Sequence, residues 1–149
     1  MKKIGSYTCR GFVNNGSVDK IELFDGRFDT AYRVTKFVIF IYDPDNSGLD
    51  GYGTLSTEPN LGTTTAGTQW LATEKNQIGW ASMPSNGSAT GPPGTPFNLV
   101  DRENLVVEDL YIYGEMNAAG GGVNYYIEMD KYEIADWEGA LTLARNKVH

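Results

Sequence analysis

Acidic residues are the side chains of this sequence best suited to proton transfer. Glu108, Asp109, Glu115, Glu128 and Asp130 fall in two neighbouring strand-like segments, and two carboxylates at a suitable separation could act as the acid and base of a glycosidase. Acidic residues that alternate along a strand usually form its solvated face instead. The alternation favours the second interpretation, so we expect no catalytic pair.

Other catalytic arrangements lack a necessary group. The single histidine is His149, at the end of the sequence, where a side chain is usually too mobile to serve as the base of a Ser-His-Asp or Cys-His site. The glycine run 120–122 joins two strand-like segments and has no helix after it to bind a phosphate. We therefore expect a protein that is not an enzyme.

The segment DPDNSGLDGYGT, residues 43–54, resembles a calcium loop. Oxygen ligands and the bend glycine of such a loop would be Asp43, Asp45, Ser47 and Gly48. Thr54 occupies the position where an EF-hand has a bidentate glutamate, although Asp50 could be a further ligand of another kind of calcium turn. The alternative is a set of tight turns capped by aspartates. The missing glutamate favours turns, and calcium is the only cofactor that we consider.

Three tryptophans suggest a possible sugar-stacking surface. Trp80 falls in a strand-like run and Trp137 on an apolar helical stripe, so we expect both in the core. Trp70 follows a Thr/Gly-rich stretch and is expected to be the exposed one. In a carbohydrate-binding protein, Trp70 would be the sugar-binding residue.

The composition excludes several function classes. The 149 residues suit one domain, and the net charge of −7 opposes binding to nucleic acid or to anionic membranes. No apolar run follows the first lysines, and the most apolar stretch, FVIFIY, is too short to cross a bilayer. Cys9 is the single cysteine, so no internal disulfide can form. These features predict a protein made in a cytoplasm.

Strands separated by turns must position these residues. We expect strands at 7–13, 18–24, 31–42, 52–57, 68–73, 77–83, 104–116 and 123–134. The last two are expected to form a long hairpin with a glycine tip. FVIFIY, within 31–42, is apolar on both faces, which predicts a central strand covered twice. The Gly/Pro-rich stretch 84–96 is expected to be an exposed loop.

The last residues change from strand to helix periodicity. An apolar stripe is formed by Ile134, Trp137, Leu141, Ala144 and Val148. This stripe predicts one short helix at about 135–147 that packs on the strands. The whole chain, 1–149, is then expected to be a single all-β domain, a two-sheet antiparallel sandwich of jelly-roll-like or, alternatively, immunoglobulin-like topology.

Several segments together resemble small virion-associated structural proteins of tailed bacteriophages, especially marine ones. The segments are KIELFDGRFDTAYRVTKFVI, LSTEP, IGWASM, NLVVEDLYIYG and NYYIEMDKYEIADWEGALTLARNK. They extend over most of the chain and contain no chemical motif. The resemblance implies a virion component, and it transfers no catalytic or ligand residue.

Three functional expectations follow, two from this resemblance and the third from the tryptophans. The first is a capsid decoration or cement protein that is assembled in the host cytoplasm and contacts the major capsid protein and further copies of itself, as a trimer for example. An acidic subunit suits the outer shell, which does not hold packaged DNA. The second is a head–tail or tail-fitting protein. The third, from another class, is a carbohydrate-binding β-sandwich module.

Overall fold

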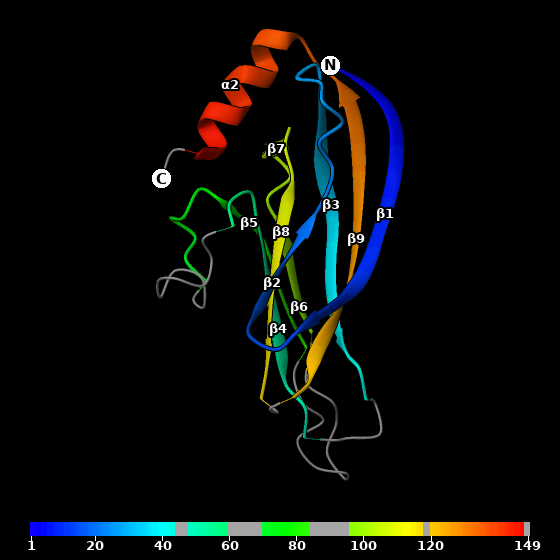
Figure 1. Ribbon diagram of the computed structural model, residues 1–149, viewed down its shortest axis with the longest axis vertical. Helices are drawn as coiled ribbons and strands as arrows, with labels where there is room; N and C mark the ends of the chain where they lie inside the picture. The colour runs from blue at the N-terminus through cyan, green and yellow to red at the C-terminus, as the bar shows by residue number, and fades with distance from the viewer. Residues whose placement is uncertain (44–47, 60–69, 84–95, 118–119, 148–149) are drawn as a thin grey trace.

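The computed structural model describes residues 1–43, 48–59, 70–83, 96–117 and 120–147. The chain forms two antiparallel β-sheets that pack face to face, and one helix lies across an end of the sandwich (Figure 1). This arrangement confirms the predicted all-β, two-sheet sandwich with a C-terminal helix. Among the described residues, no helix is long and apolar enough to cross a membrane.

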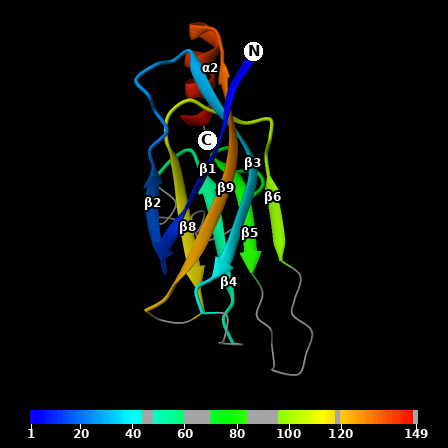
Figure 2. The ribbon, with the colours of Figure 1, turned by 90° about the vertical axis from the view of Figure 1, so that its right-hand side faces the viewer.

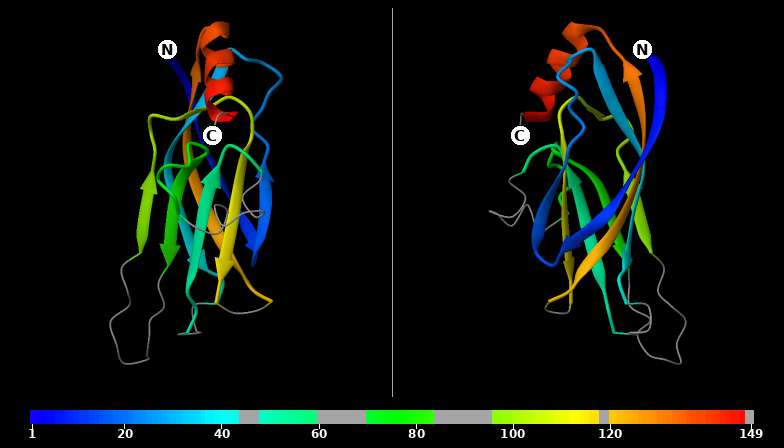
Figure 3. Two further views of the ribbon diagram at one scale, coloured as in Figure 1. Left: turned by 90° about the vertical axis from the view of Figure 1, so that its left-hand side faces the viewer. Right: turned by 45° about the vertical axis from the view of Figure 1, so that its right-hand side comes forward.

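The strands alternate between the two sheets along much of the chain (Figures 2 and 3). The first sheet has the order β1 (Lys2–Asn14), β9 (Gly122–Glu133), β3 (Thr30–Ile41) and β7 (Leu105–Val106). The second sheet has the order β2 (Ser17–Ile21), β8 (Leu110–Met116), β4 (Gly51–Ser56), β5 (Gln77–Met83) and β6 (Phe97–Val100).

The pairing of the strands is nested. β1 pairs with β9, β2 with β8, β3 with β7 and β4 with β5, all antiparallel. This is one long hairpin wrapped over two sheets, the arrangement of a jelly roll, with β6 added beside β5. An immunoglobulin fold would instead place the first two strands side by side in one sheet. Of the two topologies expected from the sequence, the structure therefore has the jelly roll.

The predicted hairpin of the last two long strands is wrong. β8 pairs with β2 and β4 in the second sheet, whereas β9 pairs with β1 and β3 in the first. The connection between them, which includes Gly120 at a φ of 80°, crosses from one sheet to the other. Alternation along a strand reveals which face is buried but not which strand is its neighbour, so the two topologies have the same sequence pattern.

The core lies between the sheets and follows the alternation of the strands. On β9, Val123, Tyr125, Ile127 and Met129 all face the core, as predicted. Facing them, Gly114 of β8 permits close approach of the sheets, because a Cβ atom there would lie 2.4 Å from Val13 Cγ1. A large cluster with residues from both sheets holds the sandwich together, and a smaller one contains Ala31, Val107 and Ile134.

The FVIFIY segment is only partly covered. Phe37 and Ile39 of β3 are fully buried in the core. Phe40, on the opposite face of the same strand, remains 45% exposed, and Tyr42 just beyond the strand is exposed as well. β3 is an inner strand of its sheet, as predicted, but the expected second cover over its outer face is not formed by the described residues.

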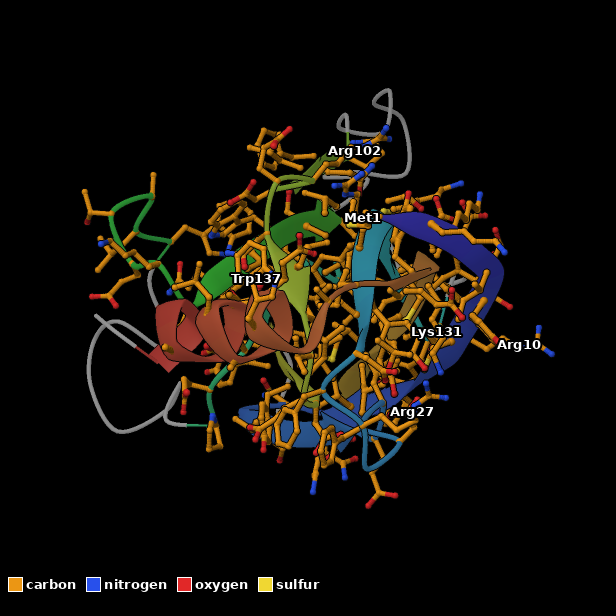
Figure 4. All side chains as sticks on the ribbon, turned by 90° about the horizontal axis from the view of Figure 1, so that it is seen from above. Met1, Arg10, Arg27, Arg102, Lys131 and Trp137 are labelled. Carbon is orange, nitrogen blue, oxygen red and sulfur yellow. The ribbon has the colours of Figure 1, made fainter. Side chains whose placement is uncertain are left out.

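The helix α2 (Asp136–Lys147) packs with the opposite side from the one predicted. Trp137 (Figure 4) is 68% exposed and Leu141 54% exposed, so this part of the apolar stripe faces solvent, whereas Ile134, just before the helix, is buried. The helix instead docks through Gly139, where a Cβ atom would lie 1.7 Å from the carbonyl oxygen of Phe28. Only a glycine permits this approach, and it orients the rest of the helix.

Candidate functional site: the aromatic face of the second sheet

Strand register brings together a row of side chains that are distant in sequence. Tyr52 of β4 lies opposite Glu115 of β8 and opposite Ser82 of β5, and Ser82 lies opposite Phe97 of β6. Residues directly opposite each other share a face of the sheet. Because Leu55 of β4 points into the core, this row lies on the outer face.

Aromatic rings occupy the middle of this outer face. Trp70 stacks on Phe97 with a centroid distance of 5.7 Å and an interplanar angle of 30°. Tyr52 contacts Trp70 edge-on at 6.1 Å and Tyr113 of β8 at 6.2 Å. We call Tyr52, Trp70, Phe97, Tyr113 and Glu115 together the aromatic face. Its rings make the offset and edge contacts that aromatic groups favour.

Trp70 belongs to a turn-containing segment and not to the strand predicted at 68–73, of which 68–69 lie outside the described residues. The side-chain oxygen of Gln77 accepts hydrogen bonds from Leu71 N at 3.1 Å and from Trp80 Nε1 at 3.0 Å. Gln77 thereby ties the segment to β5. Trp70 remains 39% exposed, in agreement with the predicted exposure.

Two phenols hold the Glu115 carboxylate in position. Tyr113 donates to Glu115 Oε2 at 2.7 Å, and Tyr52 donates to the same oxygen. Burial, together with donation to Glu115, raises the pKa of Tyr113 to about 12 and raises the pKa of Tyr52 as well. Both phenols are therefore protonated donors at neutral pH, and they fix an oxygen acceptor at one end of the aromatic rings.

A hollow of about 450 Å³ adjoins the carboxylate end of the aromatic face. Its lining is formed by Asp50, Gly51, Tyr52, Ser82, Met83, Glu115, Met116 and Asn117. The volume falls in the range of small-molecule pockets, and carboxylate, amide and hydroxyl groups stand among apolar atoms. The hollow could accept a polar group of a ligand whose flat, apolar side lies on the rings.

The other acidic residues do not gather into one site. Glu128 and Asp130 lie on the outer face of the first sheet, so the core separates them from Glu115. Glu128 accepts from Tyr126, and Asp130 accepts from Ser6 and pairs with Lys3. The predicted clustering of the acidic residues on one hairpin is therefore wrong, because that hairpin does not form.

Asp109 has a structural role that the sequence did not reveal. Its Oδ1 accepts from Leu23 N at 2.8 Å and from Phe24 N at 3.0 Å, and its Oδ2 lies 3.3 Å from Lys20 Nζ. The carboxylate thus fixes the chain where it leaves β2. Glu108, its neighbour on the connection between β7 and β8, is half-buried.

The calcium hypothesis is tested only in part, because Asp45 and Ser47 lie outside the described residues. Asn117 donates from Nδ2 to Gly48 O at 2.7 Å and accepts from Asp50 N at 3.0 Å. These bonds hold the end of the segment through its backbone. Within the described ranges, no group of three His, Cys, Asp or Glu residues could hold a metal ion, and calcium at Asp43, Asp45, Ser47 and Asp50 stays a prediction.

Two further sequence predictions concern this region. Trp80 is half-buried on the outer side of β5, and Trp137 is exposed, so neither belongs to the core cluster between the sheets, where both were predicted to lie.

The predicted loop 84–96 lies outside the described residues except for Pro96. Tyr52, Tyr113 and Glu115 were missed as a site because their proximity depends on the pairing of β4 with β8, which the sequence does not encode locally.

In the comparison with known proteins, no protein-family model and no curated protein matches the chain.

Proposed function

We propose that this protein is a non-enzymatic structural component of a virion, a decoration or cement protein on the capsid exterior. It acts through contacts with the major capsid protein and with other copies of itself, after assembly in the host cytoplasm. Jelly rolls occur in viral capsid proteins and in lectins. Because fold alone does not assign function, the proposal depends on the kind of surface that the sandwich presents.

The observation that carries the proposal is an exposed apolar patch on the outer face of the first sheet. Phe12 and Phe40 both lie opposite Asn124, one on each side of β9. The ring of Tyr42 contacts that of Phe12 at 6.2 Å. We call Phe12, Phe40 and Tyr42 the Phe40 patch. All three are substantially exposed, and clustered apolar groups on a surface mark protein contact sites.

The charged groups support the same class of function. Several acidic side chains accept hydrogen bonds from Tyr, Ser or backbone groups, as Glu115 and Asp130 on the two sheets and Asp109 on a connection illustrate. Such carboxylates position structure and do not need to transfer protons. The net charge of −7 also suits a subunit on the outside of a capsid, away from packaged DNA.

Binding to isolated capsids tests this proposal. Purified protein is mixed with undecorated capsids of the virus that encodes it, and bound protein is measured after sedimentation. We expect saturable binding that Phe40→Ser weakens by about tenfold or more, since apolar anchors dominate interfaces. Phe24→Ser, another exposed phenylalanine, is the matched control and should bind as the unchanged protein does. Binding only to a head–tail vertex would favour the head–tail alternative, and no binding to any particle would refute the virion assignment.

Carbohydrate binding is the second candidate, and the aromatic face favours it. Trp70 and Phe97 offer partly exposed ring surface, and Glu115 and the hollow supply hydrogen-bonding groups beside them. Stacking on an aromatic ring plus polar groups at its edge is how a flat sugar ring could be held. A glycan array with Trp70→Ala tests it, with Trp137→Ala as the control. Sugar binding that only Trp70→Ala removes would support this alternative.

A further inference from the structure

β1 is the longest strand edge that the described structure leaves unpaired. β1 pairs with β9 on one side at Lys2, at Lys3 and from Gly5 to Asn14, and it is the first strand of its sheet. Figure 1 shows it as the outermost strand of the molecule. Most of its residues are exposed. An unpaired edge of this length presents a row of free N–H and C=O groups that another strand can join.

Alternation in the ladder identifies which backbone groups face outward. Asn15 N donates to Gly121 O at 2.8 Å, and the same register continues without interruption from Gly5 to Asn14. In an antiparallel pair, residues whose backbone groups bond to the partner strand alternate with residues whose backbone groups point away from it. The N–H and C=O groups of Tyr7, Cys9 and Gly11 therefore face β9, and those at positions 6, 8, 10 and 12 face outward.

The two ends of β1 differ in how well they are protected. Lys2 and Lys3 are exposed, and a register irregularity lies between Lys3 and Gly5. Lysines and bulges are the devices that protect edge strands from pairing. Beyond Gly5 the ladder is regular, so the segment 6–12 is the part open to a partner.

We propose that this edge pairs antiparallel with the β1 edge of a second copy of the chain, which joins the two first sheets into one continuous sheet. Antiparallel pairing of identical strands is two-fold symmetric, so the contact closes at two copies. It is thus a two-fold contact, whereas the trimer named above as an example of a homo-oligomer would need a three-fold one. The inference does not depend on the virion assignment, and its test is made in solution.

The charged groups near the edge favour a second copy as the partner and also favour one register of the pairing. Arg10 extends outward from the edge (Figure 4) and makes no hydrogen bond or ion pair with the described residues. Thr8 lies opposite Glu128 of β9. When Arg10 of one copy lies opposite Thr8 of the other, its guanidinium is directed at that Glu128, and the two-fold axis repeats the contact.

Other registers are less favourable. A shift in one direction places Arg10 opposite Arg10 of the second copy, and like charges directly opposite each other are destabilising. A shift in the other direction places Arg10 beside Asp130, which already pairs with Lys3 and accepts from Ser6. The Thr8–Arg10 register also places Tyr7, an exposed ring, opposite Gly11, beside the ring of Tyr125 that covers this glycine.

The paired segment would form four hydrogen-bonded residue pairs, or about eight main-chain hydrogen bonds. The contact is narrow, and interfaces of that size belong to the weak, transient class. The dimer must therefore be sought over a range of protein concentration up to the limit of solubility.

Amide hydrogen exchange of the full chain, measured by NMR at low and high concentration, tests the contact directly. We expect the amides at positions 7, 9 and 11 to be protected at both concentrations. The amides at positions 6, 8, 10 and 12 should gain protection only at high concentration, together with a doubling of mass in sedimentation. A chain that stays monomeric, or a dimer in which these four amides still exchange freely, overturns the proposal.

Two sets of variants separate the contact from folding. Thr8→Pro removes an outward N–H that the monomer does not use, and proline is tolerated where an edge strand faces solvent. It should raise the dissociation constant of the dimer at least about tenfold, whereas Thr8→Val, which keeps the N–H, should not. Arg10→Glu and Glu128→Arg should each weaken the dimer and together restore it. Failure of the double variant to recover overturns the proposed register.

Discussion

Replacing Gly139 with alanine tests how the helix docks, because two effects predict opposite signs. In an ordinary helix interior, glycine to alanine stabilises by about 1 kcal/mol. Here the added methyl carbon would lie 1.7 Å from the carbonyl oxygen of Phe28. Both positions belong to the backbone, so no side-chain rotation can relieve the overlap. Overpacking of this kind costs about 1 to 3 kcal/mol, and we expect Gly139→Ala to destabilise the docked helix.

The assay compares Gly139→Ala with Leu141→Ala in urea denaturation and in amide exchange of α2. Leu141 is exposed, so its truncation should change the free energy of unfolding by less than about 0.5 kcal/mol. Gly139→Ala should lower that free energy or accelerate exchange throughout α2. A stabilising effect of Gly139→Ala, together with a cost of about 2 to 5 kcal/mol for Leu141→Ala, the value for a buried leucine, would contradict this docking of the helix. That result would mean that the apolar stripe faces the sandwich after all.

Three further predictions concern the sites described above. Burial and Glu115 raise the pKa of Tyr113 to about 12. The contribution of the Tyr113 hydroxyl to stability should therefore be complete below pH 10 and lost as the pH rises from about 10 to 12. A Tyr113→Phe variant whose alkaline unfolding matches that of the unchanged protein would contradict this. Asp109→Ala should cost about 1 to 3 kcal/mol because two backbone N–H groups lose their acceptor, with the exposed Glu22→Ala as control. Burial alone would raise the pKa of Asp109, but hydrogen bonds from Phe24 N, Leu23 N and Lys20 lower it. The difference in the free energy of unfolding between Asp109→Ala and the unchanged protein should therefore be present above pH 4 and shrink as the pH falls below it. A difference independent of pH would contradict this. Calcium and EDTA should leave the melting temperature unchanged if residues 43–54 form turns, and a calcium-dependent rise that Asp45→Asn removes would instead establish the metal site.

Local alternation was enough to predict the sandwich but not the neighbours of each strand. The inward set of β9, from Val123 to Met129, follows directly from the period of two. The partners of β8 and β9 depend on a crossing between sheets that a short glycine-rich connection permits as readily as a hairpin. For that reason the jelly roll could be offered only beside the immunoglobulin alternative, and the acidic residues were expected together when the core separates them.

Helical periodicity identified α2 and its approximate bounds, but a single glycine decided its orientation. The stripe that contains Trp137 and Leu141 has the spacing of a buried face. Close backbone contact at Gly139 turns that face to solvent, and the sequence contains no signal of which loop the glycine would meet. For Trp70, exposure was predicted correctly from the polar sequence around it. Its stacking on Phe97 was not predicted, because it depends on long-range strand pairing.

Imaging of purified virus particles by electron cryomicroscopy tests most directly the claim that this protein works through contacts on a capsid. The proposal predicts density for the sandwich at regular positions on the capsid exterior, with the Phe40 patch against a neighbouring subunit. Particles without the protein, together with a purified chain that converts a substrate through its carboxylates, would contradict it.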